Sequence, residues 1–139
     1  MSPLLSLGRL AVALFFLPTC ARAHIGDDFA TLRASYGGAE HVGNQLLFKH
    51  AGYSIAVYFD GTRSAMEIFV RDGSIPGKTD MTQADIDSIL AFEGDGQDWK
   101  PYQPVSGTSN GPIWLRADHK VIARFNTSER ILSIIENAK

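Results

Sequence analysis

The sequence predicts an α+β domain in which an antiparallel sheet of about six strands carries two helices on one face. Two segments have apolar residues at helical spacing, and each precedes several short runs in which apolar and polar residues alternate. Turn residues such as Asp-Gly and Asn-Thr separate these runs. The order of elements predicts a tandem αβββ repeat, with halves at about residues 27–72 and 81–136.

The first 23 residues have the features of a cleavable signal peptide. Arg9 precedes an apolar run at residues 10–17, and the small residues of Ala21-Arg22-Ala23 follow Pro18. The run is shorter than the roughly 20 residues that a transmembrane helix needs. A buried N-terminal helix is the alternative, but the run has no amphipathic face. We therefore expect a periplasmic or secreted protein whose single domain, residues 24–139, starts at His24.

Cysteine usage and charge exclude several classes of function. The only cysteine, Cys20, lies inside the predicted signal peptide, so the mature domain would have no disulfide and no thiol chemistry. Leu17 and Cys20 also have the spacing of a lipoprotein cleavage site, although Thr19 departs from that pattern. Removing two of the 13 basic residues leaves 11 against 15 acidic ones, and no basic cluster predicts binding to nucleic acid.

The first half is predicted to contain a helix at about residues 28–36 and three strands. Asp27-Asp28 stands at the start of the helix and Gly37-Gly38 at its end. Residues 37–44 are predicted to be a loop. The strands are expected at 45–50, 53–59 and 63–71, with a hairpin turn at Asp60-Gly61.

The second half is predicted to repeat this order. Thr82 and Asp85 form an acidic variant of the capping box at the start of a helix that ends at Gly94. Residues 94–111 are predicted to be a long loop containing Trp99 and Tyr102. Three strands follow at 113–117, 121–125 and 130–135. An offset of about 66 residues aligns the strands of the two halves, although two alternating meanders can also match by chance.

A pairing of Val57 with Met66 in the second hairpin would divide the sheet into two faces. The predicted core face contains Leu46, Phe48, Tyr53, Ile55, Val57, Phe59, Met66, Ile68, Val70, Trp114, Val121, Ala123, Phe125, Leu132 and Ile134. The predicted opposite face contains Leu47, Lys49, Ala56, Tyr58, Glu67, Phe69, Arg71, Leu115, Ile122, Arg124, Ile131, Ser133 and Ile135.

The second face mixes large apolar groups with charges, a composition typical of a contact surface. We predict a non-enzymatic interaction or inhibitor-like module that binds a protein partner, or a second copy of itself, through this face and the long loop. The expected binding residues are Tyr58, Glu67, Phe69, Arg71, Arg124, Trp99 and Tyr102. Two alternatives stay open: the loop covers the face, or its apolar residues are ordinary surface residues.

Two further functions rest on histidines. Cleavage after Ala23 would expose the α-amino group of His24 beside its imidazole, which predicts a Cu²⁺ site similar to that of the histidine-brace proteins. His41, His50 and His119 are the candidates for the second histidine of such a site. The last alternative is a small hydrolase-like enzyme that uses His119 or His41, although the sequence has no recognised catalytic or cofactor motif.

The run Phe59-Asp60-Gly61, the segment MTQADIDSIL at residues 81–90 and the segment GQDW at residues 96–99 resemble small secreted bacterial proteins of unassigned function. The helix-and-strands repeat is similar in topology to the secreted β-lactamase inhibitor protein and to small outer-membrane assembly lipoproteins. This resemblance implies a non-enzymatic binder that uses an exposed sheet.

Overall fold

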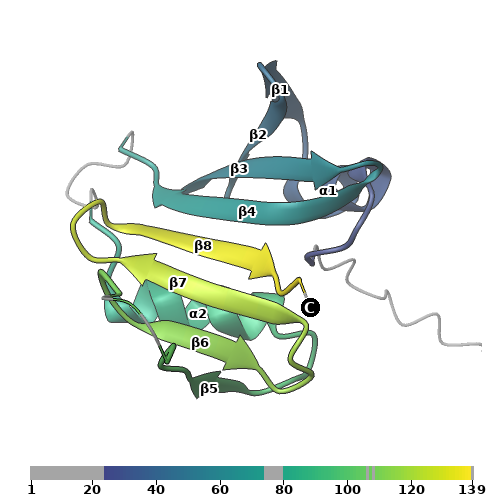
Figure 1. Ribbon diagram of the computed structural model, residues 1–139. Helices are drawn as coiled ribbons and strands as arrows, with labels where there is room; N and C mark the ends of the chain where they lie inside the picture. The colour runs from purple at the N-terminus through teal and green to yellow at the C-terminus, as the bar shows by residue number, and fades with distance from the viewer. Residues whose placement is uncertain (1–23, 74–79, 106, 108, 139) are drawn as a thin grey trace, which may run out of the picture.

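The computed structural model describes residues 24–73, 80–105, 107 and 109–138 (Figure 1). Its elements in chain order are α1 (Phe29–Tyr36), β1 (Ala39–Val42), β2 (Gln45–His50), β3 (Tyr53–Asp60), β4 (Arg63–Arg71), α2 (Gln83–Glu93), β5 (Trp99–Pro101), β6 (Ile113–Arg116), β7 (Val121–Asn126) and β8 (Ile131–Glu136). The predicted signal peptide, including Cys20, lies outside the described residues.

The strands form one antiparallel sheet in the order β1-β2-β3-β4-β8-β7-β6-β5. The predicted α+β class, with an antiparallel sheet and two helices, is confirmed. The number of strands is eight, not six, because β1 lies within the segment expected to be a loop at 37–44, and β5 lies within the predicted loop at 94–111. Both extra strands are short edge strands, so neither produces the alternating pattern that identifies a half-buried strand. Each helix is thus followed by four strands.

Side chains close to the helix ends explain where the helices begin and end. The Asp28 carboxylate accepts a hydrogen bond from the Thr31 amide (2.9 Å), and α1 ends at Gly37, whose φ of 94° favours glycine. At the start of α2, the Thr82 hydroxyl accepts from the Asp85 amide, and the Asp85 carboxylate accepts from the Thr82 amide. The predicted capping box is therefore confirmed.

Both helices pack on the same face of the sheet, which is the far face in Figure 1. Helix α1 contributes Leu32 and Tyr36, and α2 contributes apolar residues along one side. The core consists of Leu32, Tyr36, Leu46, Phe48, Ile55, Val57, Phe69, Met81, Ile86, Ile89, Leu90, Val121, Ala123, Phe125, Leu132 and Ile134. Burial of this apolar surface is the main stabilising contribution to the fold, since the described chain contains no disulfide.

A β-bulge between Tyr58 and Phe59 changes the register of β3 against β4. Val57 pairs with Glu67, not with Met66, because the bulge adds one residue, Ala65, to β4 between Ser64 and Met66. A shift of one residue moves every side chain of a strand to the other face. The predicted facing of β4 is therefore wrong: its Met66, Ile68 and Val70 lie on the open face, and its Glu67, Phe69 and Arg71 lie on the face that carries the helices.

Candidate functional site

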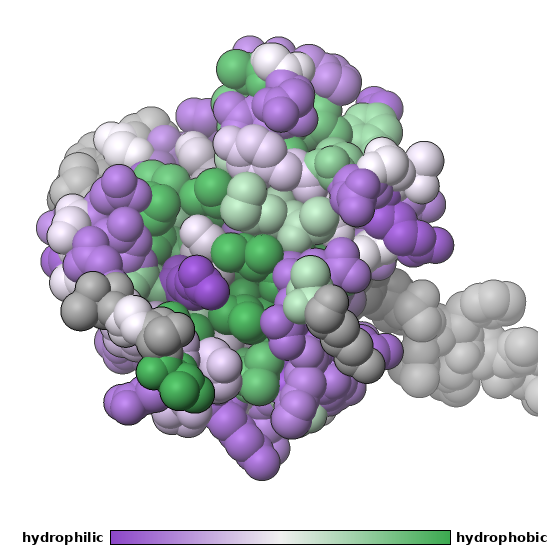
Figure 2. All heavy atoms as spheres, in the orientation of Figure 1, coloured by the Kyte–Doolittle hydropathy of each residue, from purple (hydrophilic) through white to green (hydrophobic). Residues whose placement is uncertain are grey.

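The sheet face opposite the helices, called here the open face, carries half-buried apolar side chains and has no helix packed on it. Cross-strand partners share a face, so the register identifies its members. One row runs across five neighbouring strands and comprises Tyr58, Met66, Ile135, Ile122 and Leu115. The next row comprises Glu40, Leu47, Ala56, Ile68, Ser133, Arg124 and Ile113. Figure 2 shows hydrophobic side chains gathered at the centre of this face.

Arg124 is the charged residue in the middle of the open face. It lies between Ile113 and Ser133 across the strands, and its side chain is exposed. No carboxylate in the described part of the chain forms an ion pair with it. An unpaired guanidinium surrounded by apolar groups is suited to recognising a carboxylate on a partner, because Arg can donate two parallel hydrogen bonds.

The structure divides the predicted binding residues between the two faces. Tyr58 and Arg124 lie on the open face, as expected. Glu67, Phe69 and Arg71 were predicted to lie there too, and this placement is wrong because of the bulge in β4. Glu67 and Phe69 are 0% and 3% exposed.

Arg71 acts within the domain on the helix side of the sheet. Its guanidinium contacts the Asp85 carboxylate at 3.1 Å and lies over the Tyr53 ring at 5.0 Å. The Tyr53 hydroxyl donates to the same carboxylate at 2.7 Å. Burial raises the pKa of Asp85, but the hydrogen bonds from Thr82 and Tyr53, together with the Arg71 charge, hold it below its ordinary value. The contacts among Arg71, Tyr53 and Asp85 therefore hold the start of α2 against the sheet.

The two aromatic residues of the predicted loop at 94–111 have different environments. Trp99, on β5, packs against the core, and its indole nitrogen donates to the Leu90 carbonyl at 2.7 Å. Tyr102 is 40% exposed and follows β5. Backbone hydrogen bonds join the described part of this loop to the β6–β7 end of the sheet. The centre of the open face stays in view in Figure 2.

Met66, Ile68 and Val70 are the open-face residues that the sequence analysis missed. They replace Glu67, Phe69 and Arg71, so the face is more apolar than predicted. Their alternating pattern was recognised in the sequence, but the opposite set of β4 side chains alternates with the same period. Only the position of the bulge decides which set faces the helices.

A buried acidic cluster joins both helices to the sheet on the other side. The Tyr36 hydroxyl of α1 lies 2.8 Å from Glu67 Oε2 on β4 and 3.0 Å from Glu93 Oε1 on α2. Glu67 and Glu93 are 0% and 1% exposed. The hydroxyl has one hydrogen to donate, so the second contact requires a protonated carboxyl that donates to the tyrosine oxygen. Glu67 Oε1 and Glu93 Oε2 have no hydrogen-bond partner among the described residues.

The environment of this cluster favours protonated carboxyl groups. Burial raises the pKa of Glu67 to about 7, although the hydrogen bond from Tyr36 opposes the rise. Burial, followed by the charge of Glu67, raises the pKa of Glu93 well above its ordinary value. Arg116 donates to the Glu93 backbone carbonyl at 3.3 Å, but its guanidinium is paired with Asp118 at 2.7 Å. The two carboxyls therefore lack a dedicated cation among the described side chains.

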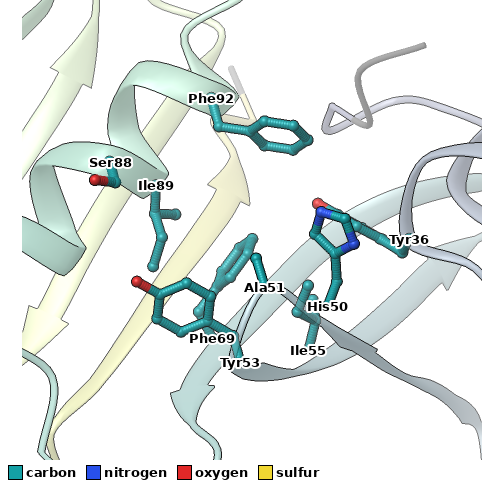
Figure 3. A pocket seen from close by; sticks show the side chains of 9 residues that line it. All are labelled: Tyr36, His50, Ala51, Tyr53, Ile55, Phe69, Ser88, Ile89 and Phe92. Carbon is teal, nitrogen blue, oxygen red and sulfur yellow. The ribbon is translucent and has the colours of Figure 1, made fainter. Parts of the chain in front are cut away.

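A small pocket opens between α2 and the β2–β3 hairpin (Figure 3). Its volume is about 150 Å³, and its lining residues are mostly aromatic and aliphatic: Tyr36, His50, Ala51, Tyr53, Ile55, Phe69, Ser88, Ile89 and Phe92. The Ser88 hydroxyl donates to the Ala84 carbonyl of its own helix and points away from the His50 ring in Figure 3. The pocket thus has no serine–histidine pair in position for nucleophilic catalysis.

Two of the four histidines lie near one pair of contacting rings: His24 is beside Phe92 and His50 is beside Tyr36. His24 contacts Asp95 (Nε2 to Oδ1, 3.5 Å) and lies near the Phe92 ring. His41 is on β1, His50 lines the small pocket, and His119 is in the β6–β7 turn with a φ of 62°. Within the described ranges, no group of three or more His, Cys, Asp or Glu side chains could hold a metal ion. A Cu²⁺ site at His24 stays a prediction.

Neither α1 nor α2, the helices of the described chain, is long and apolar enough to cross a membrane. Comparison of the chain with protein-family models, with curated proteins and with solved structures finds no match. The resemblance in topology to the β-lactamase inhibitor protein and the assembly lipoproteins therefore stays an expectation.

Proposed function

We propose that this protein is an exported, non-enzymatic binding module whose open face docks onto the surface of a partner protein. The observation that carries the proposal is the apolar row that crosses five strands without a covering helix. A sheet in a soluble domain normally presents polar residues on its outer face, whereas contiguous apolar groups mark an interaction site.

Charge indicates the chemistry of the partner. The whole chain has a net charge of −2, yet the central and β5 strands of the open face present Arg124 and Lys100 with no ion-pair partner among the described residues, and Glu40 lies at the far β1 edge. Lys49, also on this face, is paired with Asp72 at 3.7 Å. A partner that offers an apolar surface with acidic groups would complement this face, because opposite charges speed encounter and fix the orientation of a complex.

The experiment compares variants of the open face with a matched control on the helix side. Ile68→Glu introduces a charge into the apolar surface, Arg124→Glu reverses its central charge, and Ala91→Glu changes an exposed position on α2. An envelope extract supplies a candidate partner, which is then purified and titrated against each variant by calorimetry. We expect the two open-face variants to weaken binding at least tenfold, and the control to leave it unchanged.

Two results would overturn this proposal. One is equal affinity of the wild type and both folded open-face variants for the purified partner. The other is a stable dimer of the wild type, measured by light scattering, that Ile68→Glu converts to monomers. That outcome would make a second copy of the chain the occupant of the open face.

Export and the internal repeat belong to the same proposal. The signal-peptide features of residues 1–23 support action in the periplasm or outside the cell. The offset of about 66 residues relates β2, β3 and β4 to β6, β7 and β8, which supports a duplicated unit of one helix and four strands. N-terminal sequencing of the protein recovered from outside the cytoplasm tests the export, with His24 as the expected first residue.

A further inference from the structure

The segment that contains His24 and Asp27 is docked onto the start of β4. Gly26 donates its amide to the Ser64 carbonyl at 2.8 Å, and Ser64 donates its amide to the Asp27 carbonyl at 2.9 Å. The Ser64 hydroxyl donates to the His24 carbonyl at 3.2 Å, and Arg63 donates to the Gly26 carbonyl at 2.7 Å. The chain is therefore held in place from the first residue that the sequence predicts for the mature protein.

The backbone nitrogen of His24 points at a carboxylate. It donates to Asp27 Oδ2 at 2.8 Å. In the uncleaved chain this nitrogen belongs to a neutral peptide bond, and cleavage after Ala23 would turn the same atom into a charged α-ammonium group. A hydrogen bond between charged groups is about twice as strong as one between neutral groups. The predicted cleavage would therefore free the same nitrogen atom of His24 that donates the hydrogen bond to Asp27.

No Lys or Arg side chain in the described part of the chain forms an ion pair with Asp27. The charge of Asp27 raises the pKa of both Glu67 and Glu93, so the three carboxyls form one acidic region at the junction of β4 and α2. Arg116 faces this region from β6 but is paired with Asp118. An ammonium group on the His24 nitrogen would supply a cation to this region.

We propose that the amino terminus created by removing residues 1–23 forms an internal ion pair with Asp27, so that proteolytic processing completes the charge balance of the fold. The inference rests on the export proposed above. It assigns to the Ala23–His24 bond a role beyond release of the signal peptide. The unprocessed chain is less stable than the mature one, which favours an unfolded chain before export and a folded one after it.

A double-mutant cycle tests this proposal. The chain from His24 to Lys139 contains both helices, all eight strands and every core residue of the described structure, so it is the unit to purify. One protein starts at His24, released from a fusion by a protease that leaves no extra residue, and a second keeps Ala23. Asp27→Asn is made in both, and urea unfolding is measured for all four proteins.

With Asp27 present, we expect the extra Ala23 to lower the folding equilibrium constant about tenfold, because a charged hydrogen bond becomes a neutral one. With Asp27→Asn, the same extension should change it less than threefold. NMR titration of the protein that starts at His24 should also show a raised pKa of the α-amino group, since neighbouring carboxylates favour its charged form.

The proposed ion pair would be refuted if the Ala23 extension changed the folding equilibrium constant equally with and without the Asp27→Asn substitution. These measurements do not involve the open face, so failure of the proposed partner binding leaves them unaffected. A natural mature protein that begins at another residue would overturn the role of processing, and N-terminal sequencing detects that outcome separately.

Discussion

Replacing Glu67 by Gln removes one of the two buried carboxyls and keeps a side chain of the same length with an oxygen for the Tyr36 hydroxyl. The pKa of Glu67 is about 7 in the folded protein, against an ordinary value of 4.5. The folded state therefore holds a proton that the unfolded chain releases between these two pH values. The stability that this proton provides is fully present below pH 4.5 and is lost as the pH rises through 7.

The size of the effect follows from this difference in pKa. At about 1.36 kcal/mol for each pH unit, the interval from 4.5 to about 7 corresponds to roughly 3 kcal/mol. Glu67 is fully buried, so solvent screening does not reduce this figure. Asp85 and Asp118 have lowered pKa values, and the stability that they provide is lost only as the pH falls through those values, below 3.8.

Urea unfolding followed by circular dichroism between about pH 5 and 8 measures the effect. We expect the unfolding free energy of the wild type to fall with rising pH by up to about 3 kcal/mol more than that of Glu67→Gln. Glu136→Gln, at an exposed position of β8, is the control and should keep the wild-type slope. Identical slopes for the wild type and Glu67→Gln would refute the assignment of a buried, protonated carboxyl to this position.

Three further predictions concern the fold and are measured by urea unfolding. Gly111→Ala should cost about 2 kcal/mol or more, because its φ is 135° and a methyl group there would clash with a backbone oxygen of β7; an unchanged midpoint would contradict this geometry. Trp99→Phe should cost about 1–2 kcal/mol through loss of the indole hydrogen bond to Leu90, and a smaller loss would mean that the Leu90 carbonyl finds another donor. Phe69→Ala should lower the unfolding free energy by about 3–5 kcal/mol, because Phe69 is buried, and Ile68→Lys should lower it by less than about 1 kcal/mol. The reverse order would support the pairing without the bulge, in which Ile68 faces the helices.

The local elements of the fold could be read from the sequence because short-range interactions determine them. The N-cap at Asp28 and the capping box of Thr82 and Asp85 use partners three residues away. Strands β2, β3, β7 and β8 alternate between buried and more exposed residues, because one face of each strand is buried. Strands β1 and β5 escaped detection because each is short and pairs with a single neighbouring strand, so neither shows an alternating pattern.

The candidate site could be predicted only in part. Tyr58 and Arg124 were placed on the correct face because their strands have one apolar set of side chains and one mixed set. Strand β4 gives no such guide, since Met66 and Ile68 alternate with Glu67 and Phe69. The bulge opposite Tyr58 and Phe59 decides the facing of β4.

The sequence by itself determined the class of the fold, the starts of the helices and the absence of cysteine from residues 24–139. Only the tertiary structure decided which side of β4 is buried, and only it brought Asp27, Glu67 and Glu93 together. These three carboxyls come from the N-terminal segment, β4 and α2, which are far apart in the chain, so no spacing in the sequence relates them. Their proximity is a consequence of packing two helices and the N-terminal segment onto one sheet. The free energy gained by burying the whole core outweighs the local cost of burying two polar carboxyl groups.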